Sequence, residues 1–445
     1  MEKGIFKNKK VLVMGLGLHG GGVGSAKFFC KQGADVLVTD LKTEEQLKES
    51  LEKLKGLKIK FSLDGHKEDD FLWADLIIKN PDVPATSPYL EIARKNDIAI
   101  ETDISLFFKL SQAFIIGITG TKGKSTVASL IYHILKEEFE NVFLAGNIGV
   151  SVLNLLPQVK EGNKVVLELS SFELEDLEQS PHIAVITNIL PDHLNRYAGM
   201  KDYVEAKKRI FKYQNKEDVL ILNEDDAIVR QFAEEAISNV RYFSVNKPPE
   251  DVNLEGFKLY GNHNLSNLLA TIEVAKVLDV SPENIESAVK SFSGVSSRQE
   301  IVGEVRGVKY FNDTTATMPE AVIVAINTFS EKFPNSKITL ICGGQNKGLE
   351  YLKMSEAIKE KVTNVVMLPG TASDKIKLRL GDYKNIYDAP SMQMAVEKAE
   401  KLSEVGDLVI LSPGGSSFNL FKNEFDRGRQ FIEAVKKLEK NEEAS

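Results

Sequence analysis

A short segment at residues 118–126, Ile-Thr-Gly-Thr-Lys-Gly-Lys-Ser-Thr, has residue types suited to binding phosphate. Glycines in a turn let several backbone N–H groups point at one spot, and the dipole of a following helix adds positive potential there. The Lys124 ammonium would contact the outer phosphates of a nucleotide, and the Ser125 hydroxyl would bind Mg²⁺. The usual P-loop has glycine five residues before Gly123, where this chain has Ile118. The segment is therefore a shortened variant, and a chance glycine-lysine turn is the alternative.

The residues around this segment predict the elements that would hold it. Residues 113–118 form an apolar run typical of a buried strand, and the residues after it have the apolar spacing of one helix face. That face consists of Val127, Leu130, Ile131, Ile134 and Leu135. A strand, a glycine turn and a helix in this order predict an ATP site. Its predicted residues are Gly120, Thr121, Lys122, Gly123, Lys124, Ser125 and Thr126.

Two further predicted strands end in residues that can bind a metal. Residues 164–167 precede Glu168, and residues 183–186 lead into a loop with His193. Side chains at the carboxyl ends of parallel strands border the crevice in which ligands bind. Mg²⁺ prefers one or two carboxylates together with substrate phosphates and water. Glu168 and Ser125 therefore predict a first magnesium site, with a helix-capping or surface carboxylate as the alternative for Glu168.

Lys207 shares a predicted helix face with Tyr203, Ile210 and Phe211. Burial on an apolar face lowers the pKa of a lysine, because it disfavours the charged form. A neutral amine can react with carbon dioxide to form a carbamate, an anionic oxygen ligand that could hold a second Mg²⁺ with His193. The spacing alone favours a plainer interpretation, in which the stem is buried and the ammonium reaches water.

The N-terminal region has the pattern of a dinucleotide-binding unit. A predicted strand at residues 10–14 is followed by Gly-Leu-Gly-Leu-His-Gly at 15–20 and by a helix near Val23. A second predicted strand at 34–38 ends close to Asp40. This arrangement lets the backbone approach a pyrophosphate, and NAD and a UDP-sugar both fit it.

The length and the order of elements predict an α/β protein of three domains. A chain of 445 residues is too long for a single core. Strands alternate with helices throughout, and the last predicted strands lie at 308–311, 338–342, 365–368 and 408–411. We expect a Rossmann-like domain at 1–110, a central P-loop domain at 111–297 and a second Rossmann-like domain at 298–445, with a hinge at 294–297.

Composition excludes several classes of partner. The chain has 56 Lys and Arg against 64 Asp and Glu, a net charge of −8, and no basic cluster suited to nucleic acid. No apolar run approaches the roughly 20 residues that span a membrane. Cys30 and Cys342 are the only cysteines, so a disulfide framework is not expected. We expect a cytoplasmic, monomeric enzyme that acts on small molecules.

Taken together, the motifs resemble the Mur ligase family along nearly the whole chain. Besides the shortened P-loop, the central motifs are Gly-Asn-Ile-Gly at 146–149, Glu-Leu-Ser-Ser-Phe at 168–172 and Asp-His-x-x-Arg-Tyr at 192–197. The segments at 102–107, 343–348 and 412–428 resemble in particular the branch of the family that adds D-glutamate.

The resemblance implies a definite reaction. ATP would phosphorylate the carboxylate of UDP-N-acetylmuramoyl-L-alanine, and the amine of D-glutamate would displace phosphate from the acyl phosphate, in the synthesis of peptidoglycan precursors. It also implies catalytic roles for Lys124, Glu168, His193 and Lys207. For Lys207 it reverses the preference given above: the lysine would be carbamylated and would hold the second of two Mg²⁺ ions with His193.

The resemblance further implies which residues bind each substrate. The nucleotide would be held across the hinge by Asn264, Asn267, Arg298 and Asp313. D-glutamate would be held by Lys347, Ser417 and Phe418. The uridine end of the sugar nucleotide would face Leu18, His19, Asp40 and Lys42, and Asn147 would face the muramoyl part.

Some positions depart from the family pattern. Thr315 stands where the family has lysine, Asp82 where it has glycine, and Glu424 where an aromatic residue is common. These differences leave the uridine and amino-acid contacts open. The alternatives are a Mur ligase with another amino acid, a folylpolyglutamate synthetase-like ligase, a nicotinamide-dependent oxidoreductase suggested by residues 15–20 with Asp40, and a non-catalytic nucleotide-binding regulator.

Overall fold

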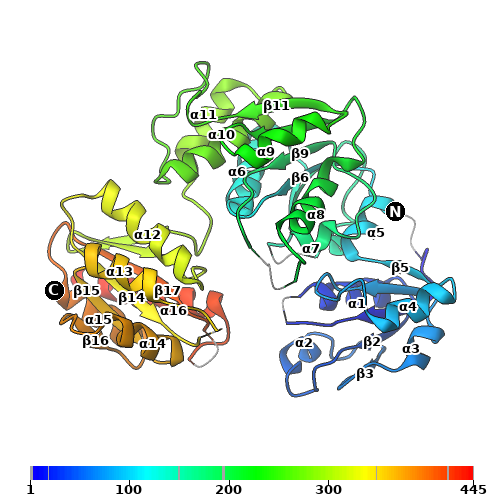
Figure 1. Cartoon of the computed structure of the whole chain (residues 1–445), viewed down its shortest axis with the longest axis horizontal. Helices are drawn as coiled ribbons and strands as arrows, with labels where there is room; N and C mark the ends of the chain where they lie inside the picture. The colour runs from blue at the N-terminus through cyan, green and yellow to red at the C-terminus, as the bar shows by residue number, and fades with distance from the viewer. Residues whose placement is uncertain are drawn as a thin grey trace. The chain divides into compact units, whose positions relative to one another are not determined.

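The computed structural model describes residues 4–18, 20–148, 151–192, 196–346, 348–417 and 420–443. It contains three β-sheets, each covered by helices (Figure 1), which confirms the predicted three-part α/β fold. The chain divides into two compact units: residues 1–255 with 263–290 contain the first two sheets, and residues 256–262 with 291–445 contain the third. The domain boundaries at 110 and 297 stay predictions.

The first sheet has five parallel strands in the order β3-β2-β1-β4-β5. The order reverses beside β1, which places a ligand-binding switch point next to the glycine turn that follows it. Its strands are β1 (Lys10–Met14), β2 (Asp35–Thr39), β3 (Ile59–Ser62), β4 (Leu76–Lys79) and β5 (Ala99–Glu101). Its helices are α1 (Gly21–Lys31), α2 (Lys48–Glu52), α3 (Glu68–Trp73), α4 (Pro88–Lys95) and α5 (Asp103–Leu110).

The second sheet has six parallel strands in the order β11-β10-β9-β6-β8-β7. The predicted strand at 183–186 coincides with β9, and β9 and β6 are the two central strands. The strands are β6 (Phe114–Thr119), β7 (Val142–Gly146), β8 (Lys164–Glu168), β9 (Ile183–Ile186), β10 (Val219–Asn223) and β11 (Asn239–Phe243). The helices are α6 (Lys124–Glu138), η1 (Val152–Asn154), α7 (Ser171–Leu174), α8 (Met200–Lys212), α9 (Ala227–Gln231), η2 (Phe232–Glu234), α10 (Asn262–Val277) and α11 (Pro282–Ser291).

The third sheet has the order β12-β13-β17-β14-β15-β16, and β12 is antiparallel to its neighbour while the other strands are parallel. The last strand runs past the predicted end at 411, because Gly414 still pairs with Gly343. The strands are β12 (Glu300–Val305), β13 (Val308–Asn312), β14 (Ile338–Gly343), β15 (Asn364–Leu368), β16 (Ile386–Asp388) and β17 (Leu408–Gly414). The helices are α12 (Pro319–Lys332), α13 (Leu352–Lys361), α14 (Thr371–Leu380), α15 (Met392–Leu402) and α16 (Glu424–Glu443).

One apolar core joins the first two sheets. It contains Val11 of β1, Phe29 of α1, Phe107 of α5, Ile115 of β6 and Leu153 of η1. The domains that carry these sheets therefore share buried apolar surface, which stabilises their association. Within the described residues, no helix is both long enough and apolar enough to cross a membrane.

Candidate functional site

The turn between β6 and α6 is shaped by two glycines with positive φ. Gly120 has φ of 145° and Gly123 has φ of 87°. A β-carbon on Gly120 would lie 1.9 Å from Thr187 Oγ1, and one on Gly123 would lie 2.3 Å from Asn267 Oδ1. Any side chain at either position would collide with its neighbour, so the compact loop at the start of α6 depends on glycine.

Thr187 and Asn188 hold the loop from the end of β9. The Thr187 hydroxyl and the Asn188 amide donate to the Lys122 carbonyl at 2.6 and 2.9 Å, and the Lys122 N–H donates to Asn188 Oδ1 at 2.9 Å. Sequence reasoning missed both residues. The available signal was their place directly after a strand that pairs with β6, where parallel strand ends meet.

Lys124 and Lys122 lie in different settings although both were predicted to bind the nucleotide. Lys124 Nζ donates to the carbonyls of Gly120 and Thr121, both at 3.1 Å, so its ammonium rests on the loop itself. The more exposed Lys122 forms an ion pair with Asp192 at 3.3 Å. Lys124 therefore lies on the loop at the start of α6, and its contact with phosphate stays a prediction.

Glu168, at the end of β8, is only 2% exposed. Its Oε1 accepts a hydrogen bond from Asn147 Nδ2 at 3.2 Å, but its Oε2 has no hydrogen-bond partner among the described residues. A buried carboxylate oxygen without a partner is costly, and a cation beside it removes that cost. The donor set thus fits Mg²⁺, although no group of three or more His, Cys, Asp or Glu in the described ranges is placed to hold a metal.

Lys207 is 1% exposed, and its Nζ donates to the Gly120 carbonyl at 2.8 Å. The interpretation that its ammonium reaches water is therefore wrong: α8 packs against the phosphate loop, and the amine ends on a loop carbonyl. Burial lowers the pKa of Lys207 well below its ordinary value, and the nearby Lys124 charge lowers it further. This environment favours the neutral amine that carbamate formation requires.

The predicted nucleotide residues fall in both compact units. Asn264 and Asn267 are buried on α10, where Asn267 Nδ2 donates to Asn264 Oδ1 at 3.3 Å. Arg298 is exposed, and Asp313 is buried with a pKa raised to about 7 by burial. Ser412 donates to the Asp313 carboxyl at 2.8 Å. The structure brings Asn267 to the phosphate loop, whereas the assignment of Arg298 and Asp313 to the nucleotide stays a prediction.

The first glycine turn is fixed by Asp40. Its two carboxylate oxygens accept hydrogen bonds from the N–H groups of Gly17 at 3.1 Å and Lys42 at 2.9 Å. Leu18 and the Lys42 side chain are exposed beside this turn. The acidic residue at the end of β2 thus shapes the loop that was predicted to face the uridine end.

The remaining predicted residues divide into described and undescribed ones. His19, His193, Lys347 and Phe418 lie outside the described residues. Ser417 is buried directly after the Gln345–Ser416 bridge that joins the two loops of the predicted amino-acid site. Their roles toward D-glutamate, the metal and the uridine end stay predictions.

Arg427 of α16 is a third residue that sequence reasoning left without a role. It is completely buried and donates three hydrogen bonds, to Thr314 Oγ1 at 3.0 Å, the Thr314 carbonyl at 2.8 Å and the Gly415 carbonyl at 3.0 Å. Burial lowers its pKa to about 10. Its guanidinium connects α16 with the segment after β13 and the segment after β17.

The three departures from the family pattern have local partners. Thr315 Oγ1 donates to the Ser297 carbonyl at 2.9 Å, so this residue ties down the predicted hinge. The Asp82 N–H donates to Asn80 Oδ1 at 3.1 Å, and the Glu424 carbonyl accepts from Thr314 Oγ1 at 2.9 Å. For Asp82 and Glu424 these contacts are made by the backbone and not by the side chain that differs from the family pattern.

Three Mur ligase domains match successive parts of the chain. Residues 9–102 match the N-terminal domain of MurD-like Mur ligases, 118–275 match the Mur ligase middle domain and 297–415 match the glutamate ligase domain of Mur ligases. The chain is 40% identical to the UDP-N-acetylmuramoylalanine--D-glutamate ligase of Roseiflexus sp. (strain RS-1), over 96% of this chain and 98% of the relative. It is 36% identical to the enzyme of that name from Acetivibrio thermocellus, over 97% of each chain.

Solved structures share the fold. UDP-N-acetylmuramate-alanine ligase MurC from Thermotoga maritima superposes with a TM-score of 0.64 at 21% identity, covering 97% of this chain and all of that one. MurF ligase from Thermotoga maritima, solved in complex with ADP, superposes with a TM-score of 0.59 at 17% identity, covering 99% and 100%. At these identities the likeness concerns the fold.

Proposed function

Since this chain belongs to the Mur ligase family, we propose that it joins D-glutamate to UDP-N-acetylmuramoyl-L-alanine and converts ATP to ADP and phosphate. The observation that carries the proposal is the 40% identity to a ligase of that name over nearly the full length of both chains. The fold supports it, because a glycine turn suited to a sugar diphosphate and a phosphate loop occur in one compact unit.

The first step brings two anions together. The carboxylate of the acceptor attacks the γ-phosphoryl group of ATP, and an acyl phosphate and ADP result. Lys124 lies on the phosphate loop, where its ammonium offsets the charge of the phosphates. The backbone N–H groups at the start of α6 orient the same phosphates, so the protein supplies mainly position and charge.

Glu168 and Ser125 would hold one Mg²⁺, and the carbamate of Lys207 would hold a second with His193. Bound Mg²⁺ supplies positive charge that screens the phosphoryl oxygens. The support for Glu168 is its buried Oε2, which has no hydrogen-bond partner in the part of the chain that the structure describes, and the support for Lys207 is its buried amine on the phosphate loop. Asn147 orients the Glu168 carboxylate through the hydrogen bond to Oε1.

The second step joins the amino acid. The amine of D-glutamate attacks the carbonyl of the acyl phosphate, and phosphate leaves from a tetrahedral intermediate. We assign Lys347, Ser417 and Phe418 to D-glutamate, with the Lys347 ammonium facing a carboxylate. We also expect a monomeric, cytoplasmic enzyme.

The test is phosphate release by the purified chain with UDP-N-acetylmuramoyl-L-alanine, ATP, Mg²⁺ and a panel of amino acids. D-glutamate should give the largest kcat/KM, and Lys124→Ala should abolish turnover. Release with a different amino acid, or with a folate acceptor instead of the UDP-sugar, would replace this proposal by one of the two ligase alternatives. Absence of release with every pair would refute it.

A further inference from the structure

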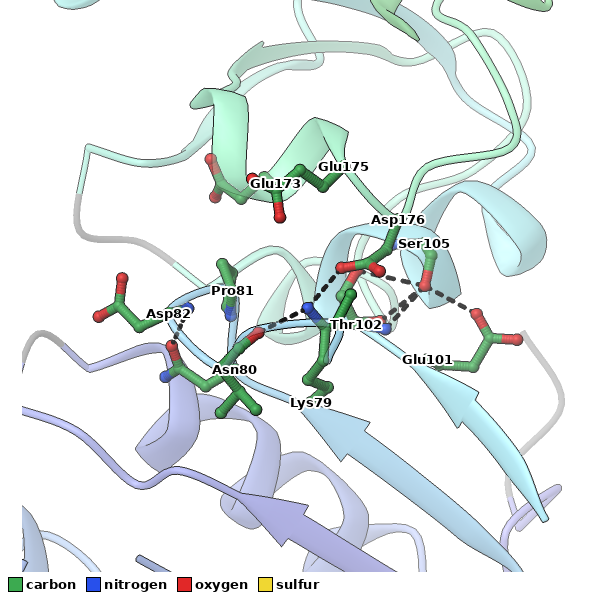
Figure 2. Close-up of polar contacts among 12 residues, drawn as sticks. Lys79, Asn80, Pro81, Asp82, Glu101, Thr102, Ser105, Glu173, Glu175 and Asp176 are labelled. Carbon is green, nitrogen blue, oxygen red and sulfur yellow. Dashed lines mark hydrogen bonds and ion pairs between the residues drawn. The ribbon is translucent and has the colours of Figure 1, made fainter. Parts of the chain in front are cut away.

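Lys79 lies at the end of β4 in the first sheet (Figure 2), and it is 1% exposed. Its Nζ donates to the Val83 carbonyl at 3.0 Å and forms an ion pair with Asp176 Oδ2 at 2.6 Å. Asp176 follows α7 of the second sheet, so the ammonium closes its own loop and also bridges two domains. We call residues 79–83 the junction loop.

Arg196 makes a second bridge to the junction loop. Its guanidinium donates to the carbonyls of Asp82 at 2.7 Å and Pro81 at 3.0 Å, and to Glu175 Oε2 at 3.2 Å. It also lies 4.5 Å from the ring centroid of Phe172. The adjacent carboxylates of Glu175 and Asp176 thus hold both cations that contact the loop.

The junction loop is attached to the first glycine turn. The Asn80 N–H donates to the Met14 carbonyl at 2.9 Å, and Asn80 Nδ2 donates to the Gly15 carbonyl at 3.2 Å. A β-carbon on Gly15 would lie 2.9 Å from Asn80 Cβ, so loop and turn are in direct contact. A displacement of the loop would therefore displace the turn.

The other end of the connection is the strand that carries Glu168. Glu175 and Asp176 come directly after α7, whose start is fixed by the capping box between Ser170 and Glu173. Only Leu169 separates that cap from Glu168. A short path of chain segments, one ion pair and hydrogen bonds therefore runs from the predicted metal ligand, through Asp176 and Lys79, to the turn predicted to hold the sugar diphosphate.

The Lys79–Asp176 ion pair fixes the relative position of two segments more specifically than the apolar core can. Apolar contacts are not directional, whereas a buried ammonium loses its compensation when its carboxylate moves. A buried pair contributes little net stability but can specify one arrangement, as polar residues do in coiled coils. In this geometry the Lys79 ammonium contacts the Val83 carbonyl and the Asp176 carboxylate.

We propose that Lys79 and Asp176 are positioning residues: they set the first glycine turn in register with Glu168 and the phosphate loop. This inference rests on the proposed ligase function. In that reaction the acceptor carboxylate must reach the γ-phosphate, so the position of the first glycine turn relative to the phosphate loop affects the rate. Loss of the pair should weaken the use of the UDP-sugar and leave the phosphate loop intact.

The experiment compares Asp176→Asn with the double variant Lys79→Met/Asp176→Leu in the full chain. The Lys79 side chain is 1% exposed and the Asp176 side chain 29%, and removing the partner of a buried charge destabilises more than replacing both charges with apolar residues. Asp176→Asn should lower Tm and raise the KM for UDP-N-acetylmuramoyl-L-alanine at least tenfold. The double variant should regain Tm but keep the raised KM, and both should bind ADP within twofold of wild type. The matched control is Lys109→Met, because Lys109 is a half-exposed lysine that pairs with Glu101 inside the first domain.

The outcomes separate the possibilities. A double variant that regains both Tm and KM would show a purely structural pair and would overturn the proposal, as would an unchanged KM in Asp176→Asn. Hydrogen exchange gives a readout without activity: exchange at residues 15–17 and 80–83 should increase at least threefold in Asp176→Asn, with the phosphate loop unchanged. If wild type releases no phosphate with this acceptor, the ligase proposal fails, while exchange still decides whether the pair fixes the turn.

Discussion

The Asn267 side chain lies against Gly123, with its Oδ1 2.3 Å from the place that a β-carbon on this glycine would take. Gly123 ends the phosphate loop, and Asn267 lies on α10, far along the chain. The contact leaves no space for a side chain at 123. It also places a predicted nucleotide residue directly on the loop that would hold the phosphates.

Replacing Gly123 with alanine should therefore impair nucleotide binding. The added methyl group must displace Asn267, and the positive φ adds roughly 1–2 kcal/mol of backbone strain. We expect the Kd for ADP, measured by calorimetry, to rise at least tenfold.

The matched control for this change is Gly162→Ala. Gly162 also has positive φ, at 81°, but a β-carbon there would meet nothing within 4 Å. This variant should have the backbone strain without the collision, and it should keep its ADP affinity. Equal affinities of the two variants would mean that the contact with Asn267 has no part in nucleotide binding.

Local patterns in the sequence predicted much of this site. The phosphate loop, the strand before Glu168 and the helix face around Lys207 follow from apolar runs and periodicity. The partners of these residues could not be predicted in that way. Thr187 reaches Lys122, and Asp176 reaches Lys79, only because particular strands and loops become neighbours.

The sequence pattern also could not predict how deeply the polar ends of Lys207 and Arg427 are buried. Periodicity placed Lys207 on the buried face of its helix, but it could not show whether the amine ends in water or on the Gly120 carbonyl. Arg427 was part of a motif without a role, because its acceptors, on Thr314 and Gly415, come from two other segments. Such contacts depend on tertiary packing rather than on local spacing.

Arg427→Met should destabilise the C-terminal unit. The change removes the buried guanidinium together with its three hydrogen bonds. The carbonyls of Thr314 and Gly415 then lack this donor. We expect a loss of about 2–4 kcal/mol, seen as a lower Tm in scanning calorimetry. The KM for the amino acid should rise as well, because Gly415 lies two residues before Ser417 in the predicted amino-acid site. Arg429→Met, at an exposed position of the same helix, should change neither quantity.

Lys207 should make activity depend on bicarbonate. Burial and the charge of Lys124 lower its pKa and so favour the neutral amine, and only the neutral amine forms a carbamate. Enzyme depleted of bicarbonate should lose activity and regain it when bicarbonate is added, and carbon-13 bicarbonate should give a carbamate signal in NMR. Lys207→Ala should be inactive and should be rescued in part by short carboxylic acids.

The neighbouring Lys208 provides the control. It lies on the same helix but pairs with Glu205 and Glu235 at the surface. Lys208→Ala should keep both the activity and the carbamate signal. A signal that persists in Lys207→Ala would place the carbamate on another residue.

Glu173 should make the protein less stable as the pH rises. Burial raises its pKa to about 8, and the charges of Asp103 and Glu168 act in the same direction. The folded state therefore keeps a proton that the unfolded state releases near pH 4.5. The stability linked to this proton is fully present below pH 4.5 and is lost as the pH rises through about 8.

Glu173→Gln tests this assignment, because glutamine cannot ionise but can still accept the hydrogen bonds of Ser170 through its amide oxygen. Variant and wild type should have similar Tm values at pH 5. The variant should become the more stable protein by pH 9, by on the order of a few kcal/mol. Asp103 titrates in both proteins, so the difference between the two curves isolates residue 173. The exposed Glu161→Gln should follow wild type throughout, and a Glu173→Gln curve parallel to wild type would mean that Glu173 is already ionised at pH 5.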